Sequence, residues 1–150
     1  MAHERNAIGM SPGEVREFLG RGRIMTTATF SADGSIHLMP MWYAFVDGYP
    51  VMWTNGRSQK IVNLRRDPRV NVMVELGEAY LDLVGVQVVG RTELIEDQAK
   101  VLEIGRLVAD RYGQLVTNDV LEYQATKRVG IRIVAERVVS WDHSKFLLAD

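Results

Sequence analysis

The stretch that decides the fold is residues 23–54, RIMTTATFSADGSIHLMPMWYAFVDGYPVMWT. Three runs in it are rich in β-branched and aromatic residues, and each is typical of a strand: 23–30, 35–46 and 49–54. Residues 31–34 (SADG) and 47–48 (DG) separate these runs and are hairpin turn sequences. The stretch therefore predicts an antiparallel meander. Pro40, inside the second run, must lie at an edge or a bulge, because it has no N–H to donate.

The pattern continues on both sides of the meander. Further strands are predicted at about 70–75, 80–94 and 128–141, and helices at about 11–20, 58–67 and 96–112. Gly85 and Gly90 are typical of bulges or barrel corners. Six strands joined mostly by hairpins favour a mainly β (α+β) fold, a small antiparallel barrel with flanking helices. Residues 1–10 read as a polar lead-in, 11–150 as a single domain, 113–127 as a loop with a short helix, and 143–150 as a tail.

Composition limits the function classes. The chain has 150 residues, 47% hydrophobic and 25% charged, with a formal net charge of −1, so general binding to nucleic acid is not expected. It has no cysteine, which excludes disulfides, thiolate metal sites and cysteine nucleophiles. We see no signal peptide and no apolar run of membrane-spanning length, and therefore expect a cytoplasmic protein that does not enter a membrane.

The strongest functional signal is residues 53–64, WTNGRSQKIVNL. They read as a strand end, a turn containing glycine, and a helix that begins at Ser58 and carries Lys60 in its first turn. The unpaired N–H groups of a helix start, a hydroxyl and a cation together suit a phosphate group. Arg57 adds a guanidinium that can grip phosphate with two bonds. Alternatively, Ser58 is only a helix cap and Lys60 an exposed, solvated charge.

Two other segments are weaker signals. In residues 37–43, HLMPMWY, Pro40 frees neighbouring backbone groups, which could meet the polar edge of a flat heterocycle; alternatively, this is an edge strand with large residues facing a core. Residues 141–145, WDHSK, could close a pocket, including one in a partner subunit, or could simply end a strand.

Recognisable catalytic machinery is missing from the sequence. The three histidines, His3, His37 and His143, do not have metal-ligand spacing, and nucleophile-elbow, P-loop and dinucleotide-binding motifs are absent. We therefore assign no catalytic residue and no metal ligand. Redox chemistry by a bound cofactor needs neither, because the cofactor carries the reactive atoms.

Together these residues resemble a known family. The resemblance rests on this order: Thr29, Asp33-Gly34, Pro40-Met41-Trp42-Tyr43, Trp53-Thr54-Asn55, Ser58-Gln59-Lys60, Asn63-Leu64-Arg65-Arg66-Asp67-Pro68-Arg69-Val70 and Val86-Gln87-Val88-Val89-Gly90. It is similar to the pyridoxamine 5′-phosphate oxidase-like superfamily of FMN-binding split β-barrels. Within it, the chain most resembles the flavin/deazaflavin-dependent oxidoreductases that bind coenzyme F-420. The resemblance covers about residues 12–145.

The resemblance implies a homodimer with two cofactor sites at the subunit interface. It implies that the coenzyme phosphate is bound by Arg57, Ser58 and Lys60, with Gln59 beside them. It implies that the ring system is lined by Pro40, Met41, Trp42, Thr54 and Asn55, with Gln87 near the ring or phosphate, either in its own subunit or in the other one. Pyridoxamine phosphate oxidases carry arginine at the position of Gln59 and an Arg-x-His motif near the C-terminus, and this chain has neither. Oxidation of vitamin B6 phosphates is therefore not expected.

The expected function is hydride transfer from reduced F-420 to an unsaturated or conjugated small molecule, whose proton comes from solvent. The alternatives are an oxidoreductase of the same fold that uses flavin mononucleotide, and a carrier that binds the coenzyme without turnover.

Overall fold

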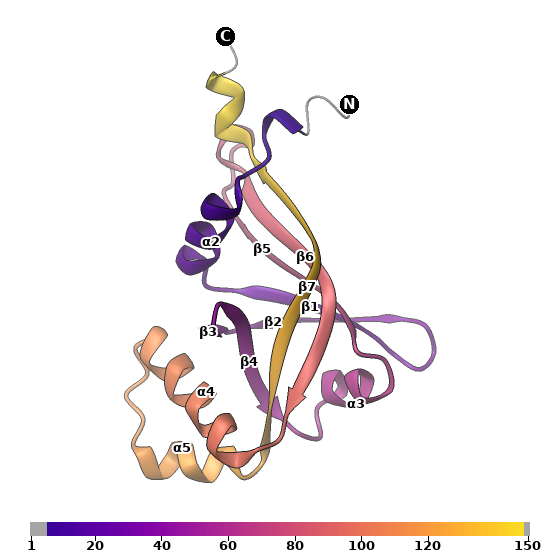
Figure 1. Cartoon of the computed structure of the whole chain (residues 1–150), viewed down its shortest axis with the longest axis vertical. Helices are drawn as coiled ribbons and strands as arrows, with labels where there is room; N and C mark the ends of the chain where they lie inside the picture. Colours follow the sequence, from indigo (N-terminus) through magenta and orange to yellow (C-terminus); the bar gives the residue numbers. More distant parts are fainter. Residues whose placement is uncertain (1–5, 149–150) are drawn as a thin grey trace.

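The computed structural model describes residues 6–148. One antiparallel sheet curls into a barrel-like shape, with strand order β2-β1-β5-β6-β7-β4-β3 (Figure 1). The strands are β1 (Met25–Phe30), β2 (Ile36–Met41), β3 (Ala44–Val46), β4 (Tyr49–Asn55), β5 (Arg69–Leu76), β6 (Val84–Ile95) and β7 (Arg128–Asp142). The helices are α2 (Pro12–Arg21), α3 (Gln59–Arg66), α4 (Gln98–Arg111) and α5 (Asn118–Ala125), with short 3-10 turns η1 (Tyr80–Asp82) and η2 (His143–Leu148).

The sheet has seven strands where the sequence predicts six, because residues 35–46 form two strands with a break at Trp42 and Tyr43. Side chains at the end of α4 cause this break. The Tyr43 N–H donates to the Tyr112 hydroxyl at 3.1 Å, and the Tyr43 carbonyl accepts from Arg111 at 2.9 Å. The Tyr43 backbone groups are therefore satisfied outside the ladder, and the chain turns from one edge of the sheet to the other.

Arg111 also ties α4 to the end of α2. Its Nη2 donates to the carbonyls of Leu19 at 3.3 Å, Gly20 at 3.1 Å and Gly22 at 2.6 Å. These are carbonyls that a helix leaves unpaired at its C-terminus, so the arginine serves as a cap supplied by another helix. The guanidinium lies 4.3 Å from the ring centroid of Tyr43, which adds a cation–π contact.

Other predictions are confirmed or refined. Pro40 lies on β2, which is an edge strand of the sheet, and the register of β6 against β7 shifts at Val89/Gly90 as expected for a bulge. The fifth predicted strand starts later, at Val84, because the three residues of η1 form a 3-10 turn instead. Residues 113–127 do contain a short helix, α5.

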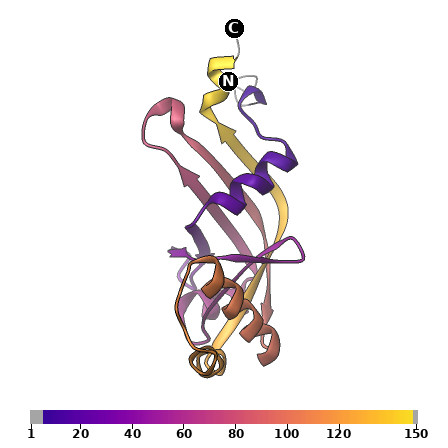
Figure 2. The same cartoon turned by 90° about the vertical axis from the view of Figure 1, so that its left-hand side faces the viewer.

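Strand β4 is covered on both faces. Met52 belongs to the core inside the curled sheet, which collects apolar side chains of β1, β5, β6, β7, α2 and α3. Val51 and Trp53 belong to a second core, formed with α4 and α5. Figure 2 shows these two helices together at one end of the molecule, while α2 lies along the sheet. Successive side chains of β4 point to opposite faces of the strand, so neighbouring residues enter different cores.

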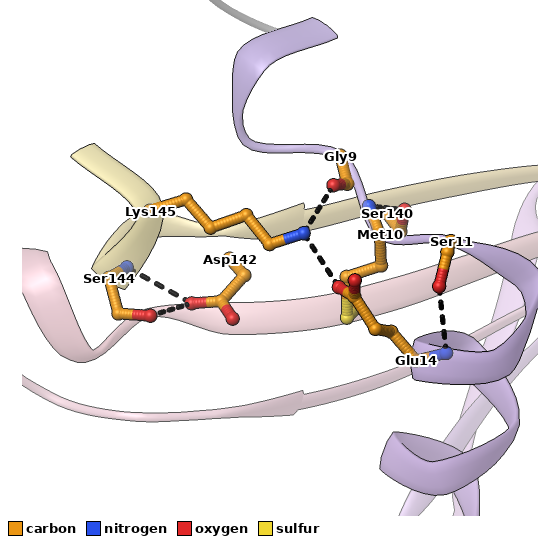
Figure 3. A network of polar contacts seen from close by, with 8 residues as sticks. All are labelled: Gly9, Met10, Ser11, Glu14, Ser140, Asp142, Ser144 and Lys145. Carbon is orange, nitrogen blue, oxygen red and sulfur yellow. Dashed lines mark hydrogen bonds and ion pairs between the residues drawn. The ribbon is translucent and has the colours of Figure 1, made fainter. Parts of the chain in front are cut away.

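The two ends of the described chain meet at the other end of the sheet. The Lys145 Nζ donates to the Gly9 carbonyl at 2.8 Å and pairs with Glu14 of α2 at 2.6 Å (Figure 3). The Met10 N–H donates to the Ser140 hydroxyl, and Ile8 is buried. Residues 8–10 therefore pack on β7. Within residues 6–148, no helix is long and apolar enough to span a membrane.

Gly105 of α4 is expected to be intolerant of a side chain. A Cβ there would lie 2.4 Å from the ring of the buried Trp53, so the indole or the helix would have to shift. We expect Gly105→Ala to lower the free energy of unfolding by about 1 to 3 kcal/mol, the usual cost of overpacking a core. Urea denaturation followed by circular dichroism measures this change.

Gly20 of α2 is the matched control, because no atom lies within 4 Å of the Cβ that alanine would add. Gly20→Ala should raise stability by roughly 0.5 to 1 kcal/mol through helix propensity. Equal effects of the two substitutions would contradict the packing of α4 on Trp53.

Candidate functional site

The candidate site is built around the first turn of α3. After β4, the Ser58 N–H donates to the Asn55 carbonyl at 3.0 Å, and the Arg57 N–H donates to the Asn55 side chain at 2.9 Å. These bonds form a tight turn with Ser58 at the N-cap of α3. The Ser58 side chain makes no capping bond, and its Oγ is buried without a hydrogen-bond partner. A buried hydroxyl without a partner is rare in native proteins and calls for a ligand or water.

Lys60 is buried, with 6% of its surface exposed. The alternative in which Lys60 is an exposed, solvated charge is therefore wrong: the inward face of α3 carries it under the sheet. Its Nζ donates to the Thr54 hydroxyl at 3.3 Å, and within residues 6–148 it forms no salt bridge. Burial lowers the Lys60 pKa from its ordinary value of 10.5. A buried cation with no counter-charge, two residues from an unpaired hydroxyl, favours an anionic ligand.

A polar network fixes the orientation of α3. Asn63 is fully buried, and its amide donates to the hydroxyls of Thr29 at 3.1 Å and Ser31 at 3.3 Å. The Gln59 amide donates to the Asn63 side-chain oxygen at 2.8 Å. The motif residues Thr29 and Asn63 thus hold the helix against β1. Gln59 is bound to this network and adds no charge to the site.

Two neighbouring cavities lie beside this turn and share Arg128 in their walls. A cavity of 660 Å³ is lined by Asn55, Arg57 and Arg128 together with residues of α5 and of the chain around α4. A smaller cavity of 220 Å³ is lined by Met41, Trp42, Trp53 and Arg128. Trp42 is held by the Tyr112 ring, which stacks on it at a centroid distance of 4.4 Å. Of the predicted site residues, Met41, Trp42, Asn55 and Arg57 line these cavities, and Thr54, Ser58, Gln59 and Lys60 line neither.

Pro40 and Gln87 lie apart from this group. Pro40 pairs with Thr26 on the exposed edge strand and lines neither cavity. Gln87 lies on β6, where its amide donates to Asn71 at 2.9 Å. Eight residues separate Gln87 from Ile95, which pairs with Gly130 beside the end of β4, and this spacing corresponds to about 26 Å along a strand. Gln87 cannot reach the same chain's site, so its expected contribution from a partner subunit stays a prediction.

The segment 141–145 lies at the opposite end of the sheet from α3. His143 and Tyr80 line a cavity of 700 Å³ there with Trp141 and Phe146. The His143 Nδ1 lies 2.8 Å from the Tyr80 carbonyl, so this nitrogen carries the hydrogen. Among residues 6–148, no three His, Cys, Asp or Glu side chains are grouped to hold a metal ion.

Sequence reasoning missed Arg128 as a site residue. It is the first residue of β7, and it comes beside Asn55 only through the pairing of β7 with β4. The alternation of residues along β7 could have indicated it, because Arg128 points to the side opposite to the buried Val129. The partner strand could not be identified from one sequence, because the 72 residues between β4 and β7 leave the register open.

The burial of Lys60 generates a stability prediction. We expect Lys60→Met to raise the free energy of unfolding at pH 7 by about 1 kcal/mol, because it removes an uncompensated buried charge. The pKa of Lys60 is lower in the folded protein than the value of 10.5 in the unfolded chain. Between these two pKa values the unfolded chain binds more protons than the folded protein, so the stability of the wild type rises with pH. The advantage of Lys60→Met should therefore shrink as the pH approaches 10.5.

Urea denaturation at several pH values tests this expectation, with Lys100→Met on the exposed surface of α4 as the control that should change little. Loss of stability in Lys60→Met at pH 7 would show that the ammonium is satisfied in the folded protein.

The chain is similar to a known protein family and to several solved structures. The family model described as pyridoxamine 5′-phosphate oxidase matches residues 11–142. A crystal structure of a conserved hypothetical protein from Mycobacterium tuberculosis is 42% identical, with a TM-score of 0.89, over 97% of this chain and 93% of that chain. An F-420 reductase is 22% identical (TM-score 0.69), over 82% of this chain and 94% of that one.

An FAD-binding protein from Mesorhizobium loti is also 22% identical, with a TM-score of 0.68, over 88% of this chain and 94% of that chain. No curated protein sequence matches the chain. At 22% identity the last two structures show the fold alone, which is the predicted split β-barrel. The family match and the 42% identical structure lead to one conclusion: the chain belongs to the pyridoxamine 5′-phosphate oxidase family.

Proposed function

We propose that this protein is an oxidoreductase that binds coenzyme F-420 and reduces an unsaturated or conjugated small molecule. The observation that carries the proposal is the unpaired, buried Oγ of Ser58 two residues from the buried, uncompensated ammonium of Lys60. A phosphate group would accept from both and lie at the N-terminus of α3. The family includes flavin-binding and F-420-binding proteins, which supports a coenzyme of this chemical class.

The residues fit such a coenzyme as follows. Ser58 and Lys60 would hold the phosphate, with Arg57 at the entrance, where its side chain is exposed. Met41 and Trp42 would line the ring system. When bound in its reduced form, F-420 supplies a hydride, and the acceptor takes its proton from solvent. The protein binds and orients both molecules and keeps water from the ring.

The rival coenzyme is flavin mononucleotide, whose phosphate would suit the same anchors. Titration of the purified protein with each coenzyme separates the two. The rival activity is a carrier that binds the coenzyme without turnover. Reduced coenzyme with enones, quinones and tetrapyrroles as acceptors tests this: tight binding with no oxidation of the coenzyme by any acceptor would favour the carrier.

We propose that the protein works as a homodimer. The sheet exposes apolar side chains on three of its strands, namely Leu38 of β2 (59% exposed), Met73 of β5 (37%) and Val139 of β7 (38%). Met73, Gln87 and Val139 are in register across β5, β6 and β7, so they form one row. A partner sheet packed on this face would bury the row and could bring Gln87 to the partner's coenzyme site.

The anion anchors generate the first functional prediction. We expect Ser58→Ala and Lys60→Ala each to weaken F-420 binding by about 1 to 3 kcal/mol, the range of a lost hydrogen bond to a charged group. Isothermal titration calorimetry measures the dissociation constants. Neither substitution should lower the melting temperature, since Ser58 makes no side-chain bond in the free protein and Lys60 is uncompensated.

Thr117→Ala is the matched control, because Thr117 is the N-cap of α5 and also makes no capping bond, but is exposed. It should leave the affinity unchanged. Wild-type affinity in both Ser58→Ala and Lys60→Ala would remove α3 from the site.

The dimer generates a further prediction. Val139→Glu should produce a monomer, because it places a charge at one end of the row formed by Met73, Gln87 and Val139, and it should weaken coenzyme binding if the partner completes the site. Light scattering after size-exclusion chromatography measures the mass. Leu115→Glu, a fully exposed apolar position beyond α4, should leave the dimer intact. A wild-type protein that is monomeric at micromolar concentration would contradict the proposed assembly.

A further inference from the structure

Arg128 is a half-buried cation that the proposed coenzyme anchors leave unused. Its guanidinium lies over the Trp53 ring, 4.4 Å from the ring centroid. Two other arginines are paired with carboxylates: Arg65 with Glu96 at 2.5 Å and Arg132 with Glu93 at 3.4 Å. Within residues 6–148, Arg128 forms no salt bridge. Burial lowers its pKa from the ordinary 12.5.

The 220 Å³ cavity has the chemistry of a small binding site. Trp42 and Trp53 supply flat apolar walls, Gln114 and Gln124 supply amides, and Arg128 supplies the charge. A guanidinium fork matches the two oxygens of a carboxylate and is held in place here by stacking on an indole. The volume is below the 300 to 1,000 Å³ usual for drug-sized ligands, so the occupant is a small molecule or one end of a larger one.

We propose that Arg128 binds the carboxylate of the hydride acceptor, whose conjugated portion lies between Trp42 and Trp53. The acceptors of this protein are then planar, conjugated carboxylic acids. This inference rests on the proposed function, since Trp42 and Met41 are also the residues expected to line the coenzyme ring. The carboxylate site itself stands on the geometry of Arg128 and its cavity.

The test uses sorbate, a small conjugated acid, and its uncharged amide, sorbamide, as probes. Isothermal titration calorimetry of the full chain should show tighter binding of sorbate than of sorbamide. Arg128→Gln should weaken sorbate binding by about 10- to 100-fold, the factor expected for a lost hydrogen bond to a charged group, and leave sorbamide binding unchanged. Arg128→Lys, which keeps the charge but not the fork, should fall between wild type and Arg128→Gln.

Lys127→Gln is the matched control. It removes the same charge from the neighbouring residue, whose ammonium is exposed, bonds to the Tyr123 hydroxyl and lines only the larger cavity. It should keep the preference for sorbate. Equal binding of sorbate and sorbamide to the wild type, or equal effects of Arg128→Gln and Lys127→Gln, would overturn the inference.

A final binding experiment distinguishes failure of this inference from failure of the proposed function. Protein saturated with F-420 should still bind sorbate, because the acceptor and the coenzyme must be bound together for hydride transfer. Displacement of sorbate by F-420 would place Arg128 in the coenzyme site and overturn the inference, while the proposed function would stand. Binding of sorbate without binding of F-420 or flavin mononucleotide would overturn the proposed function and leave the carboxylate site standing.

Discussion

The constraint on which the rest of the structure depends is that β4 is buried on both faces. Trp53 enters the core beneath α4, and the next residue, Thr54, points to the other side and accepts from the Lys60 ammonium. One strand end therefore supplies an aromatic wall to one cavity and a hydroxyl to the anion anchors. Any shift of β4 by one residue would exchange these roles, so the register of β4 against β7 determines the geometry of the whole candidate site.

The anion anchors illustrate a balance between stability and binding. Burying an ammonium without a counter-charge and a hydroxyl without a partner costs free energy in the absence of ligand. The polar network around Asn63 holds α3 against β1, so the helix cannot relax to expose Lys60. Features that oppose folding locally but persist because the surroundings fix them are concentrated at functional sites, and this observation supports the proposed coenzyme site.

Much of the fold could be predicted from the sequence because its signals are local. Turns such as Asp47-Gly48, the bulge near Gly90 and the start of α3 at Ser58 each follow from a few neighbouring residues. The site was predicted less completely because its remaining parts depend on distant pairings. The sequence left open whether Lys60 is exposed, since only the packing of α3 under the sheet determines its burial. Arg128 was missed because its neighbours come from another strand and another helix.

The bonds of Arg111 have a consequence for motion. One guanidinium joins the last carbonyls of α2 to the backbone beside Trp42, so neither segment can move away while α4 stays in place. If α4 and α5 moved away together, the bonds of Arg111 to these carbonyls and the stacking of Tyr112 on Trp42 would be lost at the same time. Amide hydrogens at the end of α2, beside Trp42 and in the α4–α5 hairpin should then exchange with solvent deuterium as one cooperative unit. A molecule that enters beside Trp42 could therefore rely on a transient collective opening and not on the rotation of a single side chain.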